Sequence, residues 1–159
     1  MRLASLLVLL LPLSAHAALK SACDLVTLTE AATLTGHPMR QAIGQDVACL
    51  YAAVAGPQTV QVSRMAGSNA SEAQQMIDMQ LKPTPSSVPG HFLKEAVPGL
   101  GDSAAFVYTT GSSSGGTATL SVRSGSTVFM LVVNPGGTPP AATMKDATMQ
   151  QMKKILSRM

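Results

Sequence analysis

The two cysteines, Cys23 and Cys49, are the residues whose chemistry is most sharply limited by their type and spacing. Two thiols can form a structural disulfide, act as a redox pair, or bind a soft metal as thiolates. A redox pair of the thioredoxin type needs the spacing C-x-x-C, and these two residues lie much further apart. In an oxidising compartment, the simplest expectation is one structural disulfide between Cys23 and Cys49.

The beginning of the chain predicts such a compartment. Arg2 is followed by an almost unbroken apolar run over residues 3–13, and Ala15-His16-Ala17 has the small-x-small pattern that signal peptidase recognises. The run is too short to span a bilayer. We therefore predict that residues 1–17 are a signal peptide, that cleavage falls between Ala17 and Ala18, and that the mature protein is periplasmic or secreted.

Methionine and histidine offer a second candidate chemistry. The chain contains ten methionines, and thioether sulfur is a soft ligand that favours Cu(I). His37-Pro38-Met39 places two potential ligands close together. Most methionines, however, fall in predicted helices, where they commonly fill the core. We therefore expect no metal and no other cofactor, with a copper site of His37, Met39 and His91 as the alternative.

Among enzymes, the sequence comes nearest to a serine hydrolase. Gly101-Asp102-Ser103-Ala104 is similar to a Gly-Asp-Ser block of esterases, in which the serine needs a histidine base and an acid. No histidine follows Ser103 in the chain. Gly99-x-Gly101-x-x-Ala104 fits a loose dinucleotide-binding fingerprint, but that motif needs a strand before it and a helix after it. We predict that the protein is not an enzyme.

Charge and aromatic content limit the partners. The formal net charge is +3 for the whole chain, and one of those charges, Arg2, leaves with the signal peptide. Aromatic residues make up 3% of the chain, with no Trp, whereas sugar-binding and single-strand nucleic-acid surfaces stack their ligands on aromatic rings. These features argue against nucleic acid as a partner. No later apolar run is long enough for a membrane span.

The hydrophobic pattern predicts one α+β domain over residues 18–159, with an antiparallel sheet of about five strands and three helices. Thr27 and Glu30 form a capping box that begins the first helix, and Gly36 ends it. Alternating or continuous apolar runs predict the strands, and helical spacing predicts the other two helices. The order is α-β-β-α-β-β-β-α, over residues 27–35, 47–54, 59–63, 69–81, 104–109, 117–123, 128–133 and 141–158.

A family resemblance covers most of residues 23–158. Cys23-Asp24-Leu25-Val26-Thr27, followed by Glu30-Ala31-Ala32, Gly36 and Cys49-x-Tyr51, resembles the opening of small exported actinobacterial proteins of the DUF3558 group. The turn Val97-Pro98-Gly99-Leu100-Gly101-Asp102 is similar to a later glycine turn of these proteins. The resemblance implies an exported, disulfide-bonded α+β domain, and implies no catalytic residues. Members are often lipoproteins, but Lys20 stands where a lipobox has an apolar or small residue.

These observations predict an exported, non-catalytic binding or accessory protein, whose partner is a protein or a small apolar ligand. Binding residues concentrate on loops held by a rigid scaffold, so we place the contact surface at residues 83–91 and 99–102. Phe92 and Leu100 are apolar candidates for anchors beside these loops, and Asp102 is a polar candidate. The alternative for Phe92 and Leu100 is that both cap the core. The oligomeric state is left open.

Overall fold

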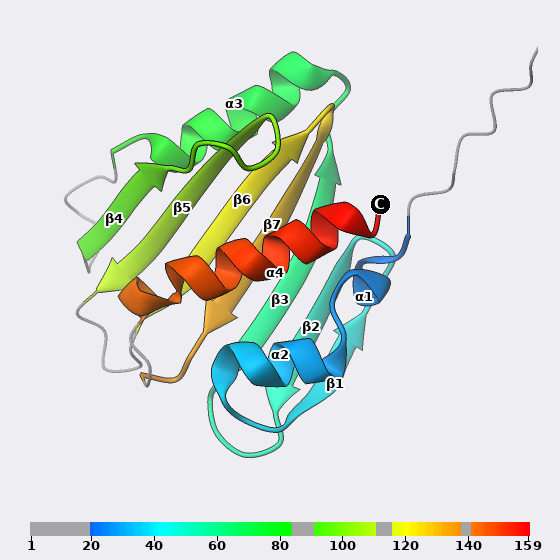
Figure 1. Ribbon diagram of the computed structural model, residues 1–159, viewed down its shortest axis with the longest axis vertical. Coiled ribbons are helices and arrows are strands. Elements are labelled where there is room, and N and C mark those ends of the chain that lie inside the picture. The colour runs from blue at the N-terminus through cyan, green and yellow to red at the C-terminus, as the bar shows by residue number, and fades with distance from the viewer. Residues whose placement is uncertain (1–19, 84–90, 111–115, 138–140) are drawn as a thin grey trace, which may run out of the picture.

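A single antiparallel sheet of seven strands, in the spatial order β1-β2-β3-β7-β6-β5-β4, forms the centre of the molecule (Figure 1). The computed structural model describes residues 20–83, 91–110, 116–137 and 141–159. In chain order the elements are α1 (Ala22–Leu25), α2 (Leu28–Thr35), β1 (Met39–Gly44), β2 (Ala48–Ala53), β3 (Thr59–Ala66), α3 (Ala70–Leu81), β4 (His91–Ala96), β5 (Ser103–Thr110), β6 (Ala118–Ser124), β7 (Thr127–Asn134), the 3-10 helix η1 (Ala141–Met144) and α4 (Lys145–Ser157).

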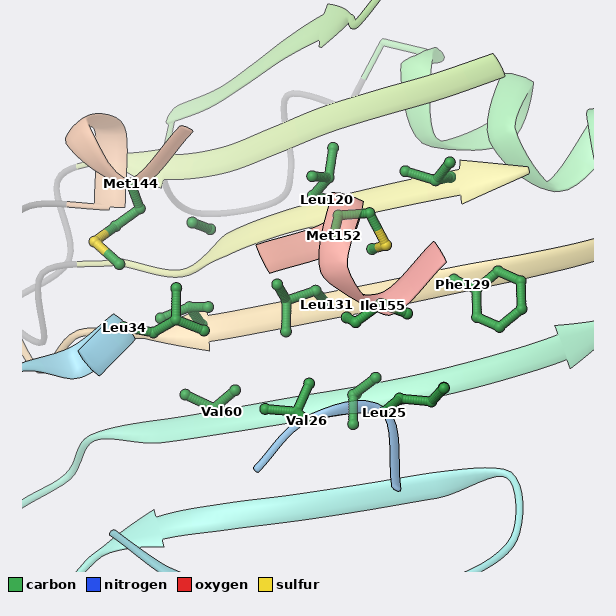
Figure 2. Close-up of a cluster of buried hydrophobic side chains, with 14 of the residues drawn as sticks. Leu25, Val26, Leu34, Val60, Leu120, Phe129, Leu131, Met144, Met152 and Ile155 are labelled. Atoms are coloured by element: carbon green, nitrogen blue, oxygen red, sulfur yellow. The ribbon is translucent and has the colours of Figure 1, made fainter. Parts of the chain in front are cut away.

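The main core lies on the face of the sheet that α4 crosses. Strand side chains alternate between the two faces, so every second residue of β3, β6 and β7 points toward α4. Figure 2 shows the resulting cluster, to which α1, α2 and η1 also contribute. Its labelled side chains, each at most 7% exposed, are Leu25, Val26, Leu34, Val60, Leu120, Phe129, Leu131, Met144, Met152 and Ile155.

Helix α3 covers part of the opposite face. Ala73 and Ile77 pack against Ala105 and Val128, which are neighbours in sequence of the main-core residues Phe106 and Phe129 and therefore point the other way. The helix lies along β4, β5, β6 and β7. The fold is thus a sheet with α1, α2, η1 and α4 on one side and α3 on the other.

The predicted helix boundaries are confirmed where they depend on caps. The Thr27 hydroxyl accepts the Glu30 N–H, and the Glu30 carboxylate accepts the Thr27 N–H, which completes the capping box. Gly36 ends α2 with a φ of 72°, a left-handed conformation that glycine adopts without strain. The side chain of Asn69 accepts the Glu72 N–H at the start of α3.

The predicted number of elements was too low. The α+β class and the antiparallel sheet are confirmed, but the described residues form seven strands and four α-helices, in the order α-α-β-β-β-α-β-β-β-β-α. The short helix α1 and the two edge strands, β1 and β4, were not predicted from the sequence. An edge strand has one neighbour and needs no apolar alternation, and β1 is mostly exposed. The predicted last helix is in fact η1 followed by α4.

The continuous apolar run over residues 128–133 is typical of a central strand covered on both faces. β7 is indeed the fourth of the seven strands. Its residues toward the main core are buried, but Met130 and Val132 on the α3 side are only half-buried. The expected cover on both faces is therefore only partly present, because α3 does not extend over the whole of its face.

The C-terminal end of α4 is hydrogen-bonded to α1 and α2. The Arg158 guanidinium donates to both carboxylate oxygens of Glu30, at 2.8 and 2.6 Å, and to the Leu25 carbonyl at 2.6 Å. This paired hydrogen bond holds the pKa of Glu30 at about 2, although burial of the carboxylate acts in the opposite direction. A bidentate arginine–carboxylate pair fixes geometry as well as contributing energy.

None of the helices in the described ranges is long and apolar enough to cross a membrane. The predicted signal peptide and its cleavage point lie outside the described residues, as do residues 84–90 of the predicted contact loop.

Candidate functional site

The predicted disulfide is confirmed. Cys23 in α1 and Cys49 in β2 are bridged, with their Cα atoms 5.0 Å apart. Both sulfurs are therefore unavailable as thiolates for redox or metal chemistry, and the bridge joins the first helix to the sheet. Such bonds persist in oxidising compartments, which is consistent with the predicted address.

Tyr51 makes a second connection beside the disulfide. Its side chain is 2% exposed, and its hydroxyl donates to the Val26 carbonyl, with the Cys23 carbonyl 3.3 Å away. Burial raises the pKa of Tyr51, with the nearby carboxylates Asp24 and Glu30 acting in the same direction. Cys49 and Tyr51 lie two residues apart on β2 and point to the same face. β2 is therefore joined to the N-terminal segment by two bonds, the disulfide of Cys49 and the hydrogen bond of Tyr51.

Two of the predicted binding residues have structural partners. Leu100 is 3% exposed and belongs to the main core, so it caps that core and does not present a surface anchor. Asp102 is half-exposed, forms an ion pair with Arg123 at 3.1 Å and accepts the Gly125 N–H at 2.8 Å. Asp102 thereby joins its own glycine turn to the turn between β6 and β7. Phe92 is half-buried on edge strand β4.

A groove opens between α3 and the strands beside the predicted turn. It has a volume of about 440 Å³, within the range of small-molecule sites. Ile77 and Leu81 form one wall of the groove, on the helix. The opposite wall is formed by the end of β4 and the start of β5. The complete lining is Gln74, Ile77, Asp78, Leu81, Ala96, Val97, Pro98, Ser103 and Ala104.

The polar part of this groove is held in one arrangement by hydrogen bonds. Gln74 Oε1 accepts the Ser103 hydroxyl at 2.7 Å and Arg123 Nε at 3.0 Å, while Gln74 Nε2 donates to Asp78 at 2.8 Å. Arg123 is in turn paired with Asp102. Asp102 therefore does not line the groove. It pairs with Arg123, which in turn donates a hydrogen bond to the groove residue Gln74.

The same geometry decides the chemistry of Ser103. A nucleophilic serine needs a base that takes its proton. The Ser103 hydroxyl instead donates to a neutral amide oxygen, which accepts a hydrogen bond and does not take up a proton. In this arrangement the Ser103 hydroxyl is therefore not activated as a nucleophile.

The alternative copper ligands are not brought together. The Gln58 amide donates to His37 Nε2 at 3.2 Å, and the Thr35 hydroxyl lies 3.4 Å from the sulfur of Met39. His91 begins β4, and β1 and β4 are opposite edges of the sheet. Six strand spacings separate these edges, which is roughly 29 Å at about 4.8 Å each.

A second groove, not predicted from the sequence, lies on the other flank of α3. It also has a volume of about 440 Å³, and three of its four lining residues are methionines: Met65, Met76, Met79 and Gln80. The spacing of Met76 and Met79 was visible in the sequence, but the pattern favoured the core for both. Their proximity to Met65 depends on where α3 sits on the sheet.

Comparison with protein-family models, curated proteins and solved structures finds no match to this chain.

Proposed function

We propose that the protein is an exported, non-catalytic binding protein, and that its ligand is a small apolar molecule held in the groove between α3 and the β4–β5 turn. The observation that carries this proposal is the lining. An apolar body formed by Ile77, Leu81, Ala96, Val97 and Pro98 ends at a few fixed polar groups, which is the usual composition of a ligand site.

The polar groups indicate what the ligand carries. Asp78 contributes a carboxylate, which accepts hydrogen bonds and attracts positive charge. Ser103 and Gln74 are already bonded to each other, so they are positioned before a ligand arrives. We therefore expect an apolar molecule with a hydrogen-bond donor or an amine at one end.

The exported address forms part of the same proposal. It is supported by the signal-like pattern of residues 1–17, by the Cys23–Cys49 disulfide and by the resemblance to the DUF3558 group. Intact mass of the protein recovered from the periplasm tests it. A mass beginning at Ala18, without a lipid adduct on Cys23, is expected.

Filling the groove tests the ligand site. Ala96 is exposed and lines the groove, so Ala96→Phe should occupy its space while leaving the core unchanged. Ala55→Phe, on the exposed β2–β3 connection, is the matched control. Titration with the neutral apolar dye Nile red should give saturable fluorescence with the wild type and the control, and little with Ala96→Phe.

Asp78→Asn separates the polar contribution from the apolar one, with Asp146→Asn, an exposed change in α4, as its control. Asp78→Asn should weaken the binding of an amphiphilic amine and leave Nile red binding unchanged. If Ala96→Phe binds the dye as the wild type does, the groove is not the site and the proposal fails.

A further inference from the structure

The methionine groove on the other flank of α3 is lined differently from the core. Met76 and Met79 are three positions apart on the helix and lie on one side of it, while Met65 approaches from β3. Met79 is 58% exposed and Met65 is 37% exposed. The main-core methionines Met144 and Met152 are 3% and 0% exposed, so Met65 and Met79 are not serving as ordinary core filler. Met76 is half-buried and also packs against the small cluster of Ala73 and Ile77 under α3.

The donor set of this groove selects a class of ligand. Three thioethers are soft, neutral donors, which favour monovalent Cu(I) and Ag(I) over Zn²⁺ or Cu²⁺. Both cysteines are already bridged, so thiolates do not compete for such an ion. In the described part of the chain, His, Cys, Asp and Glu form no group of three that could hold a metal.

We propose that the groove binds one Cu(I) ion through the sulfur atoms of Met65, Met76 and Met79. This site replaces the combination of His37, Met39 and His91, because His91 begins the edge strand β4 and Met39 begins the opposite edge strand β1. It is independent of the apolar-ligand groove, because the two grooves occupy opposite flanks of α3 and share no lining residue.

Methionine methyl NMR tests the site with Ag(I) as a redox-stable substitute for Cu(I). Protein labelled at the methionine methyl carbons is titrated with silver nitrate in chloride-free buffer. Three resonances should shift together and saturate at one equivalent, and the variants Met65→Leu, Met76→Leu and Met79→Leu assign them. Shifts spread over other methionines, or no shifts, would overturn the proposal.

The affinity for Cu(I) is then measured by competition with a chromophoric Cu(I) chelator under anaerobic conditions. Leucine keeps the size and apolar character of methionine, so Met79→Leu at an exposed position should fold normally. It should weaken binding by at least the roughly tenfold that loss of an outer-shell partner costs a metal site. Met159→Leu, at 48% exposure outside the groove, is the matched control and should bind as the wild type does.

Two further readouts separate this site from a histidine or carboxylate site. Thioethers carry no proton to lose, so Ag(I) affinity should be the same at pH 5 and pH 7, whereas a site that needs neutral histidine weakens over that range. Zn²⁺ should not displace Ag(I). Strong pH dependence or competition by Zn²⁺ would assign the ion to other ligands and refute the methionine site.

Discussion

At the scale of single residues, Tyr51 shows how one hydroxyl can hold a segment that has little regular structure. The short helix α1 and the turn after it carry the carbonyls that Tyr51 meets from β2. Since the side chain is almost completely buried, no solvent is at hand to replace its hydrogen bond.

Tyr51→Phe removes that donor and leaves the Val26 carbonyl buried. We expect the free energy of unfolding to fall by about 1–3 kcal/mol, the usual cost of an unsatisfied buried polar group. Urea denaturation measures the loss. The other tyrosine, Tyr108, is half-buried, and Tyr108→Phe should change stability by less than about 0.5 kcal/mol. Equal losses in the two variants would mean that the hydroxyl of Tyr51 is not special.

The local roles of single residues were also the features most readily predicted from the sequence. The disulfide followed from the number of cysteines and the predicted oxidising compartment, and the helix ends at Thr27 and Gly36 followed from local backbone chemistry. Leu100 could not be placed, because an apolar residue in a glycine turn can point outward or into the core. Its inward position depends on core residues that are far apart in the sequence and come together only in the folded chain.

At the scale of elements, α4 and α2 are connected by the ion pair between Arg158 and Glu30. The Glu30 carboxylate is 14% exposed and its pKa is about 2, below the roughly 4.3 of an unfolded chain. A lowered folded-state pKa stabilises the protein above the unfolded pKa. The contribution, about 3 kcal/mol, is complete above about pH 5 and is lost as the pH falls toward 2.

Arg158→Met should therefore lower stability at pH 7 by about 2–4 kcal/mol and flatten the dependence of stability on pH between 5 and 2. Thermal unfolding of both proteins across that range measures the effect. Lys153→Met removes an exposed charge from the same helix and should keep the wild-type pH profile. An unchanged profile in Arg158→Met would show that the ion pair does not control the pKa of Glu30.

Elements were predictable where they have an apolar face and not where they lie at an edge. β7, β6 and β3 alternate or run apolar because helices cover them. β4, with the sequence His-Phe-Leu-Lys-Glu-Ala, contains several good helix formers and is a strand only because β5 offers it a partner. The two grooves could not be predicted from the sequence either, because both are formed where α3 packs on the sheet.

At the scale of the whole molecule, the disulfide makes the stability of the fold depend on an oxidising environment. The bridge closes a loop with a sequence separation of 26 and joins the first helix to the second strand. Cys49→Ser should lower the free energy of unfolding by about 2–5 kcal/mol. The same loss should appear in wild-type protein treated with a reductant, and it should be absent when the variant is treated in the same way. A reductant effect on the variant would point to a cause other than this bridge.

The strand order has a consequence for how the chain can be divided. Residues 39–66 form a three-strand meander and residues 91–134 form a four-strand meander, each paired between sequence neighbours. The two meanders share one seam, the eight registered residue pairs of β3 with β7, from Thr59 opposite Asn134 to Ala66 opposite Thr127. Closing that long-range seam should be the slow step of folding. If the chain is cut between residues 83 and 91 and the two fragments are co-expressed, they should then reassemble. In the reassembled protein, α3 of the first fragment would pack against strands β4 to β7 of the second.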